Sequence, residues 1–433
     1  MSEAAAEAAF AGRSRALTFD QIAAAVIGNA LDWYDFTIYF YFATTLAALF
    51  FPGRSQAEKL LSALAAFGLA YVFRPLGGVL FGRFADLRGR KSALLLLIAL
   101  MTLGTALVAF APPYAAIGLA APCLLVLGRV LQSLSASGEF AGASAFLVEH
   151  APPDRRGFFG AWQMSGQGLS DVLAASIGLW ITFSFSARQI ETWAWRLPFI
   201  IGLLIGPVGL LIRARLGETP DFLAQLSAAD VDPVVVAVRG YKRRLAIGLG
   251  IVLGGAGALY IVDLFMPTYA ISTLGLSMQA AFVAPLIVGL MMTVLCPLFG
   301  CLSDLVGRKT VMASAILVLL LAIYPAFRWL NGGPSVARLA LLEIGFGLIA
   351  SAYAGPFSTA IAELFPVGVR ATGSGAAYNF GVAAFGGFAP LIVSWFMSRT
   401  GDPLVPAYYV MAGALISFIA CLCLPEPQSS ASQ

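Results

Sequence analysis

Charged residues and histidine are scarce in this sequence. Only 11% of its 433 residues are charged and one is histidine, whereas 60% are hydrophobic and the mean hydropathy is +0.87. Soluble chains carry about 25% charged residues, because their exposed shell needs polar side chains. The composition therefore excludes a soluble enzyme, a nucleic-acid-binding protein and a disordered scaffold. The net charge of +4 is interpreted as membrane topology rather than as a nucleic-acid-binding surface.

Signals for disulfides, metal sites and secretion are also missing. The five cysteines are odd in number and lie in or beside apolar segments without a C-x-x-C motif, which argues against a disulfide framework or a zinc site. Residues 1–17 lack the basic start and the cleavage site of a signal peptide. The single histidine, His150, is expected to cap a helix end, with pH sensing as the alternative. No nucleophile–histidine arrangement indicates an enzyme.

Long apolar runs, by contrast, are abundant. A membrane-spanning helix needs about 20 mostly apolar residues. Twelve runs qualify: 20–43, 59–82, 92–111, 116–149, 157–184, 195–214, 245–273, 279–302, 310–330, 337–364, 371–398 and 405–424. Lys and Arg are concentrated in the connections on the side of the N-terminus, which predicts that both termini are cytoplasmic. The sequence predicts an all-α membrane protein with twelve transmembrane helices.

Two loop motifs occur twice, in the same order and at almost the same interval. One reads G-x-x-x-D-x-x-G-R-K after the second and eighth spans, and the other reads E-x-x-P-x-x-x-R after the fourth and tenth. Their defining residues are Gly82, Asp86, Gly89, Arg90, Lys91, Glu149 and Arg156, and then Gly300, Asp304, Gly307, Arg308, Lys309, Glu363 and Arg370. The repeat predicts two six-helix bundles in parallel orientation, residues 1–218 and 245–433, joined by a cytoplasmic linker, 219–244. The repeated charges are expected to lock the cytoplasmic side and release when the bundles rock.

Further motifs resemble those of a known family. They are G-N-A-L-D-W-Y-D-F from Gly28, R-P-x-G-G from Arg74, G-R-x-x-Q from Gly128, W-R-x-P-F from Trp195 and E-T-P from Glu218. With the repeat, the chain resembles the metabolite:proton symporters of the major facilitator superfamily, such as citrate, α-ketoglutarate, shikimate and proline/betaine carriers. The resemblance implies the facilitator fold, proton-coupled uptake across a bacterial inner membrane by alternating access, a functional monomer and no cofactor besides the proton gradient.

Charges inside the spans indicate where protons bind. A charge near the bilayer centre costs roughly 3 kcal/mol or more, so it usually faces a cavity and has a partner. The helix rise places Asp32 and Asp35 about 18–22 Å from the inner end of the first span, and Arg129 about 20 Å from the outer end of the fourth, so all three are close to the midplane. We predict that Asp35 carries the proton and that Arg129 is its partner, with Asp32 on the same helix face; a permanent ion pair is the alternative. Glu139 either relays protons or contacts the inner loops.

Substrate contacts are predicted among polar and aromatic residues of the cavity helices. The set is Arg129, Arg74, Tyr34, Gln132, Trp162, Gln163, Asp171, Tyr260, Asp263, Tyr378 and Asn379. Arg74 either attracts an anionic substrate or bonds a carbonyl group freed by Pro75. An organic acid is the favoured substrate, partly because two stretches are most similar to citrate-type carriers. The alternative is a betaine- or proline-type zwitterion held by Asp171 or Asp263, and a membrane sensor or scaffold is a rival of another class.

Two further expectations concern the second bundle. Glu343 lies close to the outer end of its span with Arg338 nearby, so we expect the two to form a structural ion pair at the surface. The sequence G-G-x-x-P from Gly386 predicts a bend in the eleventh span that could serve gating.

Overall fold

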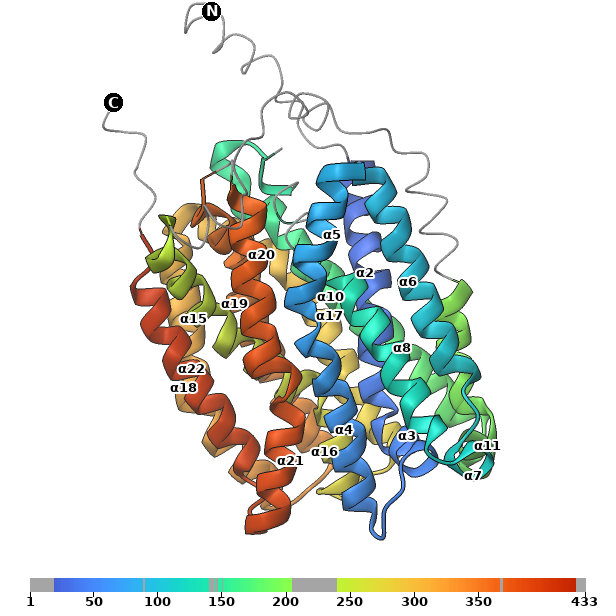
Figure 1. Cartoon of the computed structure of the whole chain (residues 1–433). Coiled ribbons are helices and arrows are strands. Elements are labelled where there is room, and N and C mark those ends of the chain that lie inside the picture. The colour runs from blue at the N-terminus through green and yellow to red at the C-terminus, as the bar shows by residue number, and fades with distance from the viewer. Residues whose placement is uncertain are drawn as a thin grey trace, which may run out of the picture.

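The computed structural model describes residues 19–88, 90–138, 140, 144, 147–149, 151–204, 240–366 and 369–425, and within these ranges it contains helices but no strand. The helices run roughly side by side in one bundle (Figure 1). Seven described helices are long and apolar enough to cross a membrane, and three shorter apolar helices accompany them. The predicted linker falls largely outside the described residues, so its boundaries remain a prediction. Below, the first half means the described residues up to 204, and the second half those from 240.

The first half supplies six spans, which begin within four residues of the predicted starts, whereas the first two run six or seven residues past their predicted ends and the α-helix of the fourth ends at Ala136. They are α2 (Phe19–Tyr41) with α3 (Ala43–Phe50), α4 (Gln56–Val72) with α5 (Arg74–Arg88), α6 (Arg90–Phe110), α8 (Ala120–Ala136), α10 (Arg156–Ser184) and the helix Ala194–Leu204. Short elements precede three of them: α7 (Tyr114–Ile117), η1 (Pro153–Arg155) and α11 (Ala187–Thr192). The connection between α5 and α6 lies at what we call the inner end, the side predicted to face the cytoplasm.

The second half supplies the other six spans. They are α15 (Lys242–Leu259) with η3 (Tyr260–Leu264) and α16 (Met266–Ser272), α17 (Met278–Val306), α18 (Arg308–Asn331), α19 (Val336–Glu363), α20 (Arg370–Gly381) with η5 (Val382–Gly387) and α21 (Ala389–Thr400), and α22 (Val405–Leu422). The positive φ of Gly307, +92°, makes the tight turn between α17 and α18 that the repeated motif predicts.

Several spans are broken rather than continuous, and proline explains three of the breaks. Proline lacks an N–H and clashes with the preceding turn, so the helix before it is interrupted. The breaks at Phe73, at η3 and at η5 are each followed within three residues by a proline, namely Pro75, Pro267 and Pro390. Both η3 and η5 are single π-helical turns, which are frequent at functional sites. The eleventh span is therefore interrupted by η5 at the place where the sequence predicts a bend.

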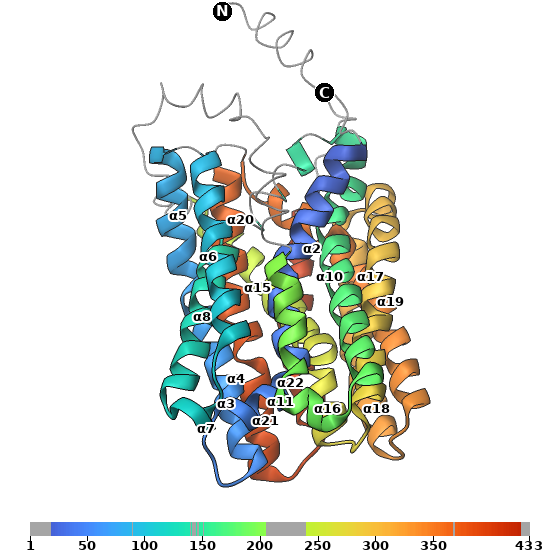
Figure 2. The same ribbon diagram turned by 90° about the vertical axis from the view of Figure 1, so that its right-hand side faces the viewer.

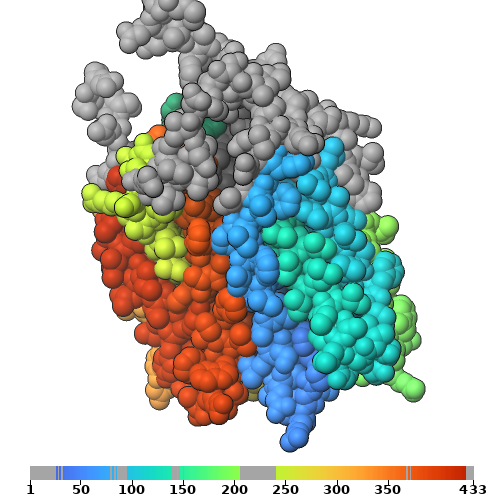
Figure 3. Space-filling view, in the orientation of Figure 1, coloured from blue at the N-terminus to red at the C-terminus, as the bar shows by residue number. Residues whose placement is uncertain are grey.

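Small residues bring the two halves together along α10 and α17, which lie side by side (Figure 2). A Cβ atom at Gly157 would strike the main chain of Gly300, and one at Gly168 would strike that of Gly289. Glycine at these positions allows the backbones to touch, as is common between membrane helices. We call the contact between α10 and α17 the seam; a second contact between the halves, along α4, α5, α20 and α21, faces the viewer in Figure 3.

The seam is closed at both ends. At the inner end, Asp304 of α17 accepts hydrogen bonds from the backbone N–H groups of Gly157 (2.8 Å) and Phe158 (2.9 Å) of α10. At the outer end, Gln279 of α17 donates to the carbonyl oxygen of Thr182 of α10 (3.0 Å). Neither end is therefore open between these two helices, and we call this arrangement the occluded state.

Candidate functional site

Arg129 is fully buried on α8, in the interior of the first half. Its Nη1 donates to Oε1 of Gln132 (2.7 Å) and to the main-chain oxygen of Asp35 (3.2 Å). Its Nε and Nη2 have no hydrogen-bond partner. The guanidinium carbon lies 4.5–4.8 Å from the centroids of three aromatic rings, those of Phe36, Tyr39 and Phe67. These rings stabilise the cation without neutralising it.

The carboxyl group of Asp35 faces Thr105 of α6 rather than Arg129. Asp35 Oδ2 is hydrogen-bonded to the Thr105 hydroxyl, and its Oδ1 is buried without a partner. Among the described residues no ion pair joins the side chains of Asp35 and Arg129. The predicted partners are thus neighbours, but they are connected through the Asp35 main chain and through Gln132, which donates to Thr105 (2.9 Å). This state therefore contains no permanent ion pair between the side chains of Asp35 and Arg129.

The hydrogen bonds of the Thr105 hydroxyl indicate whether Asp35 carries a proton. The Thr105 hydroxyl has one hydrogen, it accepts from Gln132, and two acceptors lie beside it: the carbonyl oxygen of Met101 (3.0 Å) and Asp35. A hydroxyl can donate once and accept twice. All three contacts are satisfied if Asp35 is protonated and donates to Thr105, which then donates to Met101. The arrangement therefore fits a protonated Asp35.

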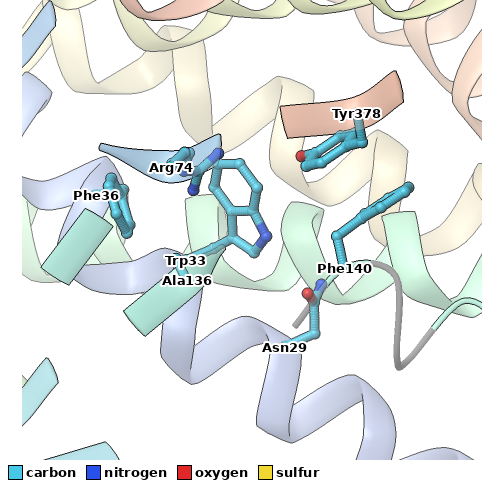
Figure 4. A pocket seen from close by; sticks show the side chains of 7 residues that line it. All are labelled: Asn29, Trp33, Phe36, Arg74, Ala136, Phe140 and Tyr378. Atoms are coloured by element: carbon cyan, nitrogen blue, oxygen red, sulfur yellow. The ribbon is translucent and has the colours of Figure 1, made fainter. Parts of the chain in front are cut away.

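Arg74 lies at the break between α4 and α5 and is 1% exposed. Its guanidinium carbon is 4.6–5.3 Å from the ring centroids of Trp33, Phe36 and Tyr71. Its Nε and Nη1 have no hydrogen-bond partner, so the expected alternative of bonding to a freed carbonyl is not seen for these atoms. The side chain lines a small cavity of about 10 Å³, where Figure 4 shows the hydroxyl of Tyr378 on the side facing Arg74, with which it interacts.

A second cavity of about 30 Å³ adjoins the first and shares Trp33 and Tyr378 with it. Its wall is rich in aromatic side chains from both halves: Trp33, Tyr260, Tyr353, Phe357 and Tyr378. Among the residues that the structure describes, no acidic side chain lines either of these two cavities. A cavity needs roughly 10–15 Å³ to hold one water molecule. The occluded state therefore has space for a few water molecules at most, and a substrate must widen the cavities when it binds.

Three of the predicted substrate contacts line these cavities: Arg74, Tyr260 and Tyr378. The others have different surroundings. Tyr34 donates to the carbonyl oxygen of Pro198 (2.9 Å), Gln163 donates to Asn29 (2.9 Å), and Asn379 donates to the carbonyl oxygen of Ser137 (2.8 Å). Gln132 belongs to the Arg129 network, and Trp162, Asp171 and Asp263 line neither cavity. Residues that our sequence-based site set missed are Thr105, Phe140, Tyr353 and Phe357, because nothing in their local sequence separates them from packing residues.

The inner-end contacts come from the second copy of the repeated motif. Asp304 pairs with Arg308 (2.8 Å) in addition to its two bonds to α10. Arg308 also pairs with Glu363 (3.4 Å). Two further contacts join the two halves at this end. Arg370 pairs with Glu149 (3.1 Å), and the hydroxyl of Thr359 donates to the carbonyl oxygen of Arg156 (2.9 Å).

Several predicted residues cannot be compared with the structure. Gly89, Glu139 and His150 lie outside the described residues. The same holds for the side chains of Asp32, Gly82, Asp86, Arg90 and Lys91. Their roles remain predictions.

The expectation for Glu343 is wrong. Glu343 is 0% exposed, both of its carboxylate oxygens lack a hydrogen-bond partner, and the charge that it faces is Asp263. Arg338 instead donates to the carbonyl oxygen of Trp329 (2.9 Å). The error came from judging depth alone, since Glu343 shares the buried face of α19 with Leu339 and Phe346 at helical spacing.

Comparison with known proteins identifies the family. The model described as Major Facilitator Superfamily matches residues 25–297, and the model described as Sugar (and other) transporter matches residues 225–430. This chain belongs to the major facilitator superfamily. Its fold is the twelve-helix facilitator fold, and the protein is a multi-pass membrane transporter rather than an enzyme.

Curated relatives cover nearly the whole chain. A citrate-proton symporter of Salmonella typhi is 34% identical over 94% of this facilitator and 94% of its own length. An ectoine/proline transporter of Corynebacterium glutamicum is 36% identical over 93% and 82%. A proline/betaine transporter of Escherichia coli is 32% identical over 94% and 83%.

Solved structures confirm the fold. A D-xylose-proton symporter superposes with a TM-score of 0.73 at 19% identity, covering 94% of this facilitator and 98% of the other chain. A partially occluded, inward-open form of the E. coli xylose transporter gives a TM-score of 0.74 at 17% identity and the same coverage.

Proposed function

We propose that this facilitator takes up a small carboxylate-bearing metabolite together with protons across a bacterial inner membrane. The observation that carries the proposal is the guanidinium of Arg74, which is buried, has unpaired donors and lines a cavity between the halves. Relatives named as proton symporters of citrate support proton coupling and a carboxylate substrate. In this proposal both termini are cytoplasmic, the monomer is the working unit, and the proton gradient drives transport without a cofactor.

The chemistry of Arg74 suits a carboxylate. Arginine presents parallel N–H donors that match the two oxygens of a carboxylate, and such charge-assisted bonds are stronger than neutral ones. Nε and Nη1 are the two nitrogens without a partner, and they lie on different edges of the guanidinium because the N–H of Nε points toward Nη2, so each can donate a separate hydrogen bond to an anion. The rings of Trp33, Phe36 and Tyr71 hold the cation in place until an anion arrives.

Asp35 is the proposed proton carrier. Its hydrogen bonds fit the protonated form in the occluded state, and the absence of an ion pair with Arg129 leaves both side chains available to other partners. Asp35 and the cavity residues Trp33 and Phe36 are close together on α2. Widening of the cavity by a substrate would therefore move the helix segment that holds the proton, which couples the two binding events.

A zwitterion with a methylated ammonium group is a second candidate, favoured by the aromatic wall of the larger cavity. Ring faces bind such cations through cation–π attraction without any acid. Asp171 and Asp263, which the sequence analysis proposed as partners of the ammonium group, line neither cavity. A fully ionised tricarboxylate fits less well, because Arg74 is the only cation on the described cavity walls.

A thermal-shift screen of the purified protein, followed by uptake into proteoliposomes, tests the proposal. Citrate, α-ketoglutarate, proline and glycine betaine are compared on wild type, on Arg74→Gln and on the control Arg338→Gln. A ligand that shifts the wild-type melting temperature identifies the substrate, since binding stabilises the folded state. Arg74→Gln should weaken its binding about 10–100-fold, the equivalent of hydrogen bonds to a charged group. Unchanged binding in Arg74→Gln would remove Arg74 from the site.

A further inference from the structure

We propose that Asp171, Asp263 and Glu343 form a second proton-binding site, separate from Asp35, and that its protonation allows the outer end of the transporter to close. These three residues, called the acidic cluster below, line neither of the two cavities and take no part in the inner-end contacts. The proposal rests on proton coupling as proposed above, but not on the identity of the substrate.

The acidic cluster joins the two halves. Asp171 is on α10 in the first half, whereas Asp263 is in η3 and Glu343 is on α19, both in the second half. All three side chains are 0% exposed. Asp171 and Asp263 interact directly with each other, and Glu343 faces Asp263. Carboxyl groups from three separate helices are thus gathered at one buried place.

In the described part of the chain, the elements around the acidic cluster contribute hydroxyl groups but no cation. Thr37 of α2 donates to Asp171 Oδ1 (3.2 Å), and Tyr41 of the same helix lies beside all three acids. On the other packed helices α15, α17, α18 and α21, the described charged residues lie at or near helix ends: Lys242, Arg243, Arg244, Asp304, Arg308, Lys309, Arg328 and Arg399. In the part of the chain that the structure describes, no Lys or Arg forms an ion pair with any of the three acids.

Unpaired oxygens indicate that the acidic cluster holds protons. Both oxygens of Asp263 and of Glu343, and Oδ2 of Asp171, are buried without a hydrogen-bond partner. Ionised carboxylates in such surroundings are strongly disfavoured, and like charges this close cannot all ionise. Protonation supplies what is missing, since a neutral carboxyl group can donate to a neighbouring carboxylate or hydroxyl oxygen. The occluded state therefore fits a cluster with most of its acids protonated.

The location of the cluster connects it to the outer end of the seam. The ring of Tyr41, beside the three acids, packs against Phe282 of α17 at 5.8 Å between centroids. Phe282 also packs against Gly178, one turn before Thr182, whose carbonyl oxygen binds Gln279. Loss of the protons would place negative charges on both halves, with Asp171 about 16 Å along α10 from Thr182, and their repulsion would separate the halves. Protons arriving from the outer water phase would remove the repulsion and let the seam close.

Crosslinking at the outer seam tests this directly without a substrate. Thr182→Cys and Gln279→Cys are introduced into a background whose exposed cysteines, Cys123, Cys301 and Cys423, are replaced by serine. The yield with a short bifunctional thiol reagent is measured in proteoliposomes between pH 5 and 9. It is normalised to a Tyr269→Cys/Asn331→Cys pair, which lies within the second half and corrects for thiol reactivity.

We expect the normalised yield to fall several-fold as the pH rises. In Asp171→Asn/Asp263→Asn/Glu343→Gln the yield should stay high at every pH, because the amides keep the cluster neutral. Asp35→Asn should retain the wild-type pH dependence, which separates the two proton sites. A pH dependence that survives in the triple variant, or is absent from the parent pair, would overturn the proposal. The single variants provide the same test if the triple variant does not fold, and each should flatten the profile in part. Failure to find a substrate would not affect this assay.

Discussion

The molecule contains two buried clusters of charged side chains, which differ in the sign of their charges and in their surroundings. Arg74, Arg129 and Asp35 lie in the first half among aromatic rings, next to the cavities. The acidic cluster lies across the seam among hydroxyl groups, with no cation paired to it in the described residues. An arginine cannot lose its charge in a protein, whereas a carboxyl group can. The two arginines of the first region therefore keep a positive charge that can bind an anion, with Asp35 as the titratable group beside them, whereas every acid of the second region can change its charge during the cycle.

Removal of Arg129 should have the largest effect. Arg129→Ala leaves the carbonyl oxygen of Asp35 and the side chain of Gln132 without their donor and opens a gap among three rings. We expect both proton-driven uptake and substrate exchange to fall below detection in proteoliposomes. Normal uptake kinetics in a folded variant would show that the first region is not organised around Arg129.

Asp35→Asn should separate the two activities. The amide cannot release a proton, but it keeps the size of the side chain and the bond to Thr105. Uphill accumulation driven by a proton gradient should be abolished, while exchange of labelled for unlabelled substrate continues within several-fold of wild type. Full accumulation by the variant would mean that the proton is carried elsewhere.

Asp304→Asn should slow transport without abolishing binding. The carboxylate accepts two backbone N–H groups of α10 and pairs with Arg308, so its loss weakens the closed inner end by about 2–3 kcal/mol. We expect roughly tenfold slower exchange with substrate affinity within several-fold, because the contact governs the interchange of states. Asp86→Asn, in the first copy of the motif, is predicted to act in the same direction. Lost binding with an intact fold would place the loop in the substrate site.

Glu149→Gln should have the smallest effect and serves as the matched control. Glu149 pairs with Arg370 at the same inner end, but its side chain is 35% exposed. Exposed ion pairs contribute about 0–1 kcal/mol. Exchange rates should change by less than about threefold, and a change as large as that of Asp304→Asn would mean that exposure does not distinguish the two gate contacts.

Hydropathy and the repeated motifs were sufficient to predict the fold. The predicted spans match the described helices because a long apolar run has few alternatives to a membrane helix. The second copy of the loop motif forms the inner contacts as predicted, because charge and spacing are visible in the sequence. The bend at η5 was also visible, since glycine and proline mark it.

Side-chain partners were harder to predict. Depth along a helix does not reveal the direction in which a side chain points, which is why Glu343 was mistaken for a surface residue. Residue type also does not reveal which of several neighbours a side chain bonds. Asp35 was placed next to Arg129 correctly, but its carboxyl group is bonded to Thr105, a residue with no signal in the sequence. Aromatic side chains of the cavity wall look like packing residues until the halves are brought together.

The most direct test of the account is whether Arg74 binds a carboxylate. Affinities of the identified substrate and of its carboxamide are measured by thermal shift on wild type and on Arg74→Gln, which gives a double-mutant cycle with one change on each partner. We predict a coupling of about 1.5–3 kcal/mol, so that wild type prefers the carboxylate about 10–100-fold and Arg74→Gln shows little preference. The same preference in both proteins would show that the carboxylate is bound elsewhere and would contradict the account.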